Sequence, residues 1–192
     1  KETYLQTIQQ LQQRILRGDC YEINYCMEFF SEDAVINPLE IYQQLIGISP
    51  NPFSCFYKVN SKYLLCASPE RYLKKDGNTI ISQPIKGTIQ RDGANINADE
   101  TNKKQLFESN KDRSENVMVV DLVRNDLSKI CIENSVQVEE LFGIYTFPQL
   151  HQMISTVKGE LKSGVDLAGI LKATFPMGSM TGAPKKRVME LI

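Results

Sequence analysis

Apolar residues recur at helical spacing near the start of the chain. Four of them stand three or four positions apart: Leu5, Ile8, Leu11 and Ile15. This spacing places them on one face of a helix. Gly18 follows, and glycine commonly ends helices because it adopts left-handed backbone angles without strain. The pattern predicts an amphipathic helix that ends at Gly18.

The next stretch, YEINYCMEFF (residues 21–30), alternates between two kinds of position. Every second residue from Tyr21 to Phe29 is aromatic or aliphatic. A period of two predicts a half-buried strand. Farther on, Asn37 and Pro38 suit the cap and first turn of a short helix, which we expect Gly47 to close.

Residues 53–110 divide into strand-like and polar parts. Three segments are rich in strand-forming residues: FSCFYKV (53–59), KYLLCA (62–67) and RYLKKDGNTIISQPI (71–85). Asp76, Gly77 and Asn78 have the composition of a hairpin turn, so we expect a meander of antiparallel strands. Residues 92–110 are polar and have no clear period, which predicts a surface loop or a frayed helix.

The second half of the chain mixes both kinds of element. Residues 111–130 are predicted to be helical, and the segments 136–145 and 151–161 are predicted to be strands. A helix near residues 165–173 leads into FPMGSMTGAPKKRVMELI (175–192), a loop that opens another helix. Helices mixed with mostly antiparallel strands predict an α+β fold.

Composition narrows the class of protein. The 192 residues carry a net charge of −1, which gives no electrostatic reason to expect a nucleic-acid partner or an anionic membrane. No apolar run is long enough for a membrane span. Five cysteines, an odd number without a CxxC pair, favour reduced thiols in a cytosolic protein. The single histidine, His151, has no nucleophile near it in the sequence.

Carboxylates fall on one face of the predicted 111–130 helix. Asp112 and Glu115 share this face with Val119 and Leu122. A carboxylate on an apolar stripe is costly unless it is paired or bound to a cation. One interpretation is a solvated face with internal ion pairs. The other is that Glu115 holds a hard divalent cation through oxygen, as magnesium prefers.

Two further segments have candidate chemistry. In GSMTGAPKKR (178–187), glycines flank Ser179 and Thr181 ahead of a predicted helix, whose exposed amides can attract an anion such as a carboxylate. An ordinary tight turn before a capped helix explains the same residues. In ISQPIKGTIQR (81–91), Lys86 is expected on a strand next to Glu70, and the residues alone indicate only a salt bridge.

Six stretches, in order along the chain, resemble the chorismate-utilising enzymes: GDCYEINY, ASPER, PIKGT, KDRSENVMVVDLVRNDL, QMISTVKGEL and FPMGSMTGAPKKRVME. Position 86 separates the branches of this family. Anthranilate synthases typically have alanine there, whereas aminodeoxychorismate synthases typically have lysine, as in this sequence. The resemblance implies an α+β fold with two antiparallel sheets packed face to face and helices outside.

The resemblance also implies a reaction, the amination of chorismate at carbon 4 to 4-amino-4-deoxychorismate, toward 4-aminobenzoate and folate. Lys86 would be the nucleophile: its neutral amine adds at ring carbon 2 as the 4-hydroxyl leaves. Glu70 would be the acid that protonates the departing hydroxyl. Ammonia from a glutamine amidotransferase partner would then enter at carbon 4 and expel Lys86.

Magnesium is the implied cofactor. Glu115 matches a family ligand, and Asp112, one turn earlier, would act through water. The carboxylates of chorismate would be held by amides, hydroxyls and one ammonium group, from Gly87, Thr88, Ser179, Gly182, Ala183 and Lys185. His151 is left outside the core chemistry, because the histidine of anthranilate synthases corresponds to Gln152.

The resemblance further implies that residues 1–192 are a chorismate-binding catalytic domain, incomplete at its C-terminal end and without the family's N-terminal region. The expected location is the cytoplasm. Two other interpretations stay open: the large component of an anthranilate synthase, and a fragment that binds or assembles without catalysis.

Overall fold

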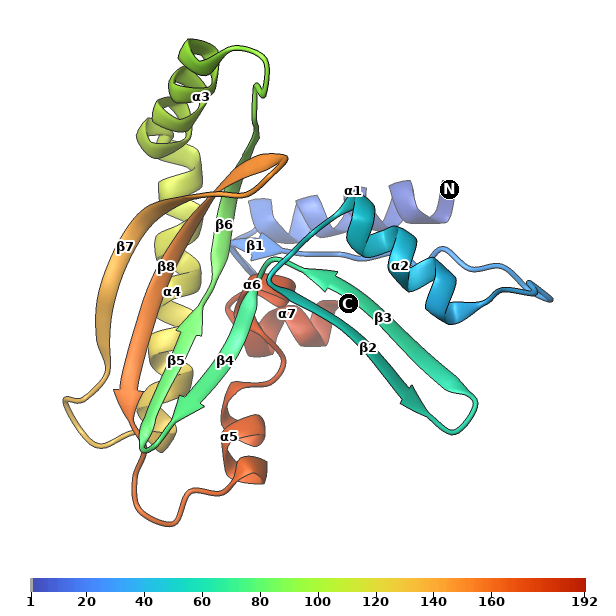
Figure 1. The fold of residues 1–192 in the computed structure, drawn as a ribbon. Helices are drawn as coiled ribbons and strands as arrows, with labels where there is room; N and C mark the ends of the chain where they lie inside the picture. Colours follow the sequence, from blue (N-terminus) through green and yellow to red (C-terminus); the bar gives the residue numbers. More distant parts are fainter. Residues whose placement is uncertain (1) are drawn as a thin grey trace.

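The computed structural model describes residues 2–192, which form an antiparallel sheet with one long helix, α4 (Asn110–Ile130), along one face (Figure 1). The central strand is β8 (Leu150–Glu160). One edge of β8 pairs with β7 (Gln137–Thr146). The other edge pairs in succession with β5 (Thr79–Gln83) and β6 (Ile85–Gln90), and β4 (Arg71–Asp76) lies outside β5.

A bulge in β6 determines the position of Lys86. Ile85 is paired with Ile154 and Thr88 with Gln152, so Lys86 and Gly87 together lie opposite a single residue of β8. Such an extra residue bends a strand and changes the direction of its side chains. Gly87 has a φ of 100°, and a Cβ there would lie 3.0 Å from Cβ of Asp112 on α4. Glycine therefore allows both the bulge and the close approach of α4.

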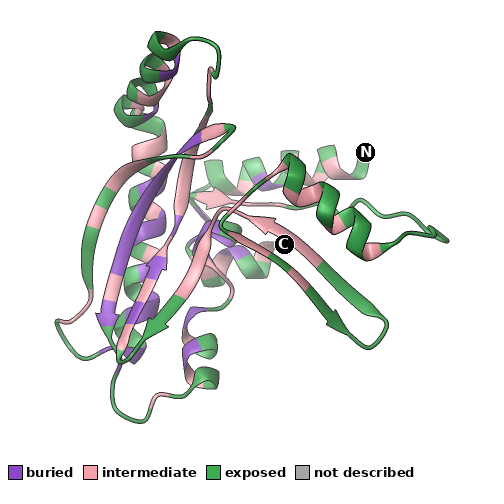
Figure 2. Cartoon of the chain, in the orientation of Figure 1, coloured by how far each residue is buried: buried purple, intermediate pink, exposed green. Residues whose placement is uncertain are grey.

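The core lies between α4 and the sheet (Figure 2). Val119, Val123 and Leu127 stand four residues apart on α4 and are buried. They pack with Ile80 of β5, Val157 of β8 and residues of α5 (Leu167–Thr174). The helix forms here because its apolar stripe is covered by an apolar sheet face.

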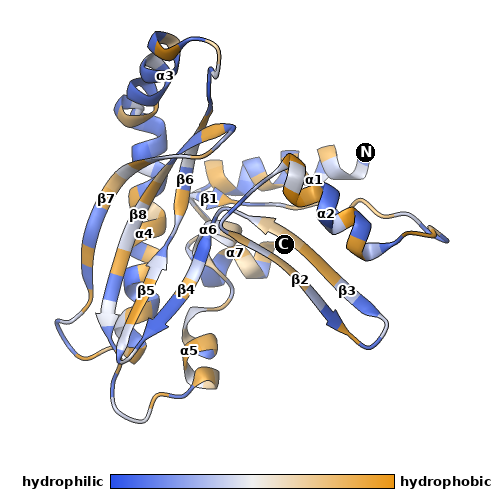
Figure 3. Ribbon diagram, viewed as in Figure 1, coloured by the Kyte–Doolittle hydropathy of each residue, from blue (hydrophilic) through white to orange (hydrophobic). Residues whose placement is uncertain are grey.

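The N-terminal part is built differently. It contains α1 (Glu2–Leu16), the two-residue strand β1 (Glu22–Ile23), α2 (Pro38–Ile48) and the hairpin of β2 (Phe53–Val59) and β3 (Lys62–Ser68). The hairpin projects away from the five-stranded sheet (Figure 1). Figure 3 shows apolar residues on α2 and the hairpin, yet none of the residues described for these three elements is buried.

The C-terminal residues return to the N-terminal part. After α5, the chain forms α6 (Gly178–Thr181), the short strand β9 (Gly182–Ala183) and α7 (Lys185–Leu191). Strand β9 pairs with β1, so that Glu22 lies opposite Ala183. Within residues 2–192 no helix is both long and apolar enough to cross a membrane.

Most predicted elements are confirmed, and so is the α+β class. Helix α1 is followed by Gly18 at a φ of 80°, Asn37 caps α2, and Gly77 at a φ of 57° forms the β4–β5 turn. Helix α2 runs past Gly47 and is capped by Ser49. Besides the five-stranded sheet, the described residues form two sheets of two strands.

Two predicted segments differ from the structure: residues 92–110 follow the helical alternative but form a regular helix, and the strand at residues 21–30 was predicted too long. Residues 96–108 form a regular helix, α3 (Ile96–Glu108), because the Asn95 side chain accepts hydrogen bonds from the amides of residues 97 and 98 and because Leu106 is buried. The predicted strand at residues 21–30 shrinks to Glu22–Ile23, where β9 supplies a partner. The alternating residues Tyr21 and Phe29 are exposed. Alternation therefore does not produce a strand where no second strand is aligned with it.

Candidate active site

The Lys86 side chain points from the bulge of β6 toward β1. Its ammonium group forms an ion pair with Glu22 and lies 3.5 Å from Oδ1 of Asn24. Only 15% of the Lys86 side chain and 16% of the Glu22 side chain are exposed. Because water is largely excluded, the interaction is less screened than a surface salt bridge.

Pairing of β1 with β9 brings Glu22 to this position. The Tyr21 amide donates to the carbonyl of Ala183, and the Asn24 amide donates to the carbonyl of Thr181, both at 2.8 Å. Between them, Gly182 has a φ of 131°, and a Cβ there would lie 2.1 Å from the Glu22 carbonyl oxygen. Only glycine fits, so Gly182 sets how closely the two segments approach.

Glu70 lies between β3 and β4 and reaches the same strand as Lys86. Its Oε1 accepts a hydrogen bond of 3.0 Å from the Ile85 amide. Burial raises the pKa of the Glu70 carboxyl, while the Ile85 amide, the Ser179 hydroxyl and the charge of Lys86 oppose this rise. A raised pKa keeps the carboxyl protonated to higher pH, as a general acid requires.

Glu70 lies near Lys86, but not because their two strands are neighbours in the sheet, as the sequence had led us to expect. Strand β4 does not flank β6; it flanks β5, which continues into β6 past Pro84. At Pro84, between β5 and β6, the Ser155 amide of β8 donates a hydrogen bond of 3.2 Å to the Pro84 carbonyl, so β8 stays bonded to the chain across this junction. Glu70 therefore meets the residue before Lys86, and the ion pair of Lys86 is made with Glu22.

A buried amide fixes the backbone of the bulge. Asn116 of α4 donates from Nδ2 to the carbonyls of Lys86 and Met153, each at 3.4 Å. Its Oδ1 accepts a hydrogen bond of 2.5 Å from the Ser155 hydroxyl. The bulge is thus tied to the helix and to the central strand, which limits movement of Lys86 at the backbone.

The two predicted metal ligands stand one turn apart on α4. Oε1 of Glu115 lies 3.5 Å from Nζ of Lys111, and the Asp112 side chain lies beside Gly87. The buried face of α4 begins at Asn116, so the apolar face predicted to include Glu115 is displaced by one residue. Among residues 2–192, no three His, Cys, Asp or Glu side chains gather as a metal site. The pair offers the oxygen donors that suit Mg²⁺, from one side only.

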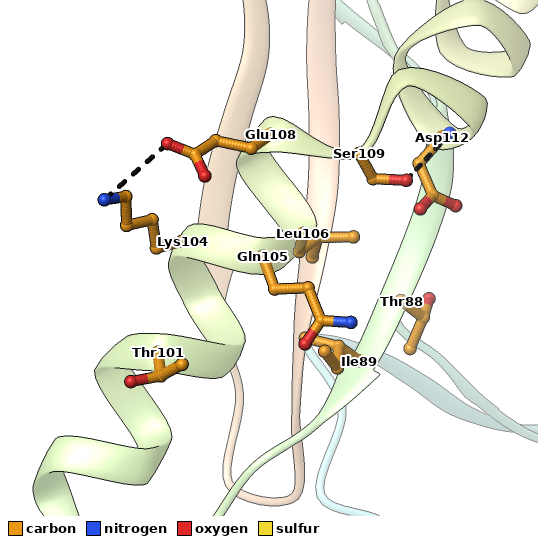
Figure 4. Close-up of a pocket in the computed structure, with 9 residues that line it drawn as sticks. All are labelled: Thr88, Ile89, Thr101, Lys104, Gln105, Leu106, Glu108, Ser109 and Asp112. Carbon is orange, nitrogen blue, oxygen red and sulfur yellow. Dashed lines mark hydrogen bonds and ion pairs between the residues drawn. The ribbon is translucent and has the colours of Figure 1, made fainter.

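Thr88 and Asp112 line a groove of about 650 Å³ between α3 and β6 (Figure 4). Gln105 and Ser109 also line it, together with the apolar side chains of Ile89 and Leu106, so the lining is both polar and apolar. Lys86 is not among the lining residues. The structure therefore places Thr88 and Asp112 together in this groove and not beside the Lys86–Glu22 ion pair.

The C-terminal loop contributes buried groups to the site. Ser179, Gly182 and Ala183 are buried, and the Gly182 amide already donates to the Gly178 carbonyl. The Ser179 hydroxyl is buried and forms no hydrogen bond with any residue among 2–192. Their contacts with substrate stay predictions.

Lys185 takes part in the fold. Its ammonium forms an ion pair with the buried carboxylate of Asp126 and donates to the Thr174 carbonyl at 3.1 Å. The positive charge that was expected to meet the substrate is therefore balanced inside the protein. A contact of Lys185 with substrate stays a prediction.

The chain matches the family model described as chorismate binding enzyme over residues 1–192. It is 37% identical to aminodeoxychorismate synthase component 1 of Escherichia coli over 192 residues, all of this chain and 42% of that protein. The corresponding Bacillus subtilis protein is 34% identical over 192 residues, with 40% of its length covered.

The structure of anthranilate synthase component I from Streptococcus pneumoniae superposes with a TM-score of 0.81 at 28% identity, covering 97% of this chain and 40% of that one. The chain belongs to the chorismate-binding enzyme family. It spans less than half the length of these relatives.

The chorismate-binding fold thus brings together Lys86, Glu70 and the Ser179–Ala183 loop, with Asp112 and Glu115 to one side. Three residues near Lys86 were not proposed from the sequence: Glu22, Asn24 and Asn116. Glu22 and Asn24 belong to GDCYEINY, one of the matching stretches, so the signal was present but gave no role. His151 is buried, with its ring nitrogens 3.0 Å from Asp99 and 2.9 Å from Thr146, where it ties β8 to α3 and β7.

Proposed function

We propose that the protein containing this chain aminates chorismate at carbon 4 to give 4-amino-4-deoxychorismate. The observation that carries the proposal is Lys86, largely shielded from water on a bulge of β6, next to an acid whose pKa is raised by burial. Family membership and the likeness to aminodeoxychorismate synthases support it. Lysine at position 86 is the residue typical of that branch.

In this proposal Lys86 and Glu70 act on opposite ends of one displacement. The Lys86 amine forms a bond to ring carbon 2, the ring double bonds shift, and the bond from carbon 4 to the hydroxyl oxygen breaks. Glu70 gives its proton to this oxygen, which leaves as water. Ammonia then attacks carbon 4, the double bonds shift back, and the bond to Lys86 breaks.

Magnesium is proposed as the cofactor. Glu115 and Asp112 would hold it from α4, with the remaining ligands from substrate and water, since Mg²⁺ keeps several non-protein ligands. Bound there, the ion would draw negative charge from a substrate carboxylate. We further propose that ammonia comes from a glutamine amidotransferase partner and that the enzyme works in the cytoplasm.

The test is the substitution Lys86→Ala in the full-length protein, assayed with chorismate, ammonia and Mg²⁺. We expect 4-amino-4-deoxychorismate formation to fall by at least about a thousandfold while chorismate still binds, because the covalent step is lost. Lys158→Ala is the control, since Lys158 pairs with Glu139 on β7 at the surface. Turnover by Lys86→Ala at the wild-type rate would contradict the proposal.

A second candidate is anthranilate synthesis, favoured by the structural likeness to an anthranilate synthase component I. That reaction places the amine at carbon 2 and yields a fluorescent aromatic product. Mass and fluorescence of the wild-type product therefore separate the two. A protein that binds chorismate but forms neither product would be a binding or assembly module.

A further inference from the structure

The Lys86–Glu22 ion pair raises a chemical problem for the proposed function. A nucleophilic lysine must be neutral, and the structure shows its nitrogen held by a carboxylate as an ammonium. The proton must leave before the bond to substrate forms. Glu70 cannot accept it, because in the proposed function Glu70 must itself be protonated to release the hydroxyl.

Glu22 is the carboxylate placed to accept this proton. Its Oε1 is in contact with the Lys86 nitrogen, and its Oε2 is buried with no hydrogen-bond partner among residues 2–192. A buried, unpartnered carboxylate oxygen is costly in the ionised form. Oε2 is therefore an unused acceptor beside the Lys86 nitrogen, whereas a purely structural salt bridge would have both carboxylate oxygens satisfied.

The surroundings hold Glu22 in one position. Asn24 donates from Nδ2 to the Ser179 carbonyl at 3.1 Å and to Glu22 Oε1 at 3.4 Å. The β1–β9 pairing and Gly182 fix the backbone on the other side. Two carboxyls therefore flank Lys86 with different partners: Glu70 on a backbone amide, Glu22 on the ammonium.

We propose that Glu22 is a further catalytic residue of this site, the proton acceptor that frees the Lys86 amine; this rests on the proposed function. Substrate that fills the site excludes water, and separated charges then cost more than a neutral amine beside a neutral carboxyl. The proton moves from Lys86 to Glu22, and the amine attacks carbon 2. When ammonia later expels the lysine, Glu22 returns this proton to the departing nitrogen.

The protons balance over the cycle. Glu70 gives one to the leaving hydroxyl and regains one from the ammonia nitrogen after it has bonded to carbon 4. Glu22 takes one from Lys86 and gives it back. The sum is chorismate plus ammonia to 4-amino-4-deoxychorismate plus water, with no oxidant or reductant.

The experiment measures formation of the Lys86 adduct by intact mass in the full-length protein, mixed with chorismate and Mg²⁺ without ammonia. The variants are Glu22→Gln, Glu22→Asp and, as a control, Glu139→Gln, a glutamate in a surface lysine pair. We expect Glu22→Gln to slow adduct formation by about a hundredfold or more. Its rate should also rise about tenfold per pH unit between pH 7 and 9, since hydroxide must then remove the proton. Glu22→Asp should restore part of the rate.

The outcomes separate this inference from the proposed function. No Lys86 adduct in the wild type would overturn both. An adduct in the wild type and an equal rate with the same pH profile in Glu22→Gln would overturn the role of Glu22 alone. Loss of chorismate binding in Glu22→Gln, measured by calorimetry, would also overturn it, because the residue would then be structural. Unchanged binding with a slow, hydroxide-dependent adduct supports the proposal.

Discussion

The five-stranded sheet with α4 (the sheet side) and the N-terminal part with its β2–β3 hairpin (the hairpin side) contain similar apolar residues but bury them to very different extents. On the sheet side, Leu127 and Val157 are fully buried between α4 and β8. On the hairpin side, Tyr57 and Leu64 remain 60% and 57% exposed, although they occupy regular strands. The difference shows that a strand pattern buries its apolar face only where another layer lies against it.

The candidate active site lies where these two regions meet. Lys86 belongs to the sheet side, where Asn116 and β8 fix its backbone. Glu22 belongs to the hairpin side and is held in place by the short β1–β9 pairing. The proposed nucleophile Lys86 is therefore anchored to the core, whereas its charge partner Glu22 is held by a two-residue pairing between distant segments.

The largest effect should come from the ion pair that links α4 to α7. Asp126→Ala leaves the ammonium of Lys185 buried without its partner, which should lower the free energy of unfolding by about 3–5 kcal/mol. Asp121→Ala on the same helix removes an exposed pair with Arg124 and should change it by less than about 1 kcal/mol. Urea unfolding measures both, and equal losses would refute the contrast.

A direct comparison of the two regions uses one leucine from each. Leu127→Ala should lower the free energy of unfolding by about 2–5 kcal/mol, because it opens a cavity in the core. Leu64→Ala on the hairpin should change it by no more than about 0.5 kcal/mol, because the side chain is mainly exposed. A large loss at Leu64 would mean that the hairpin face is covered in solution.

The smallest effect concerns acid stability at the end of the sheet. The hydrogen bond from Arg91 is the main cause that lowers the pKa of Asp99 from 3.8 to about 2; burial opposes it, and the Asp92 amide and His151 add to the lowering. As the pH falls, Asp99 is therefore protonated at a higher pH in the unfolded chain than in the folded protein. The stabilisation is complete above about pH 4 and is lost as the pH falls toward 2.

Asp99→Asn tests this contribution. The variant should lose less stability than the wild type between pH 4 and pH 2, measured by urea unfolding at each pH. Parallel pH curves for the two proteins would show that Asp99 has an ordinary pKa.

The sequence by itself determined most elements of the sheet side. The helix α4, the glycine turn before β5 and the strands β7 and β8 were predictable because local period and turn residues agree with the tertiary environment. It also identified the family, through motifs whose order along the chain is specific. The cap and buried Leu106 of α3 were overlooked because most of that helix is polar.

Only the tertiary structure decided which residues contact Lys86. Glu22 and Ala183 are far apart in the chain, and no local pattern encodes their pairing. The bulge at Gly87 and the positive φ of Gly182 become meaningful only once α4 and β1 are seen to approach them. Long-range contacts of this kind depend on packing between elements, whereas periodicity reports only which face of each element is apolar.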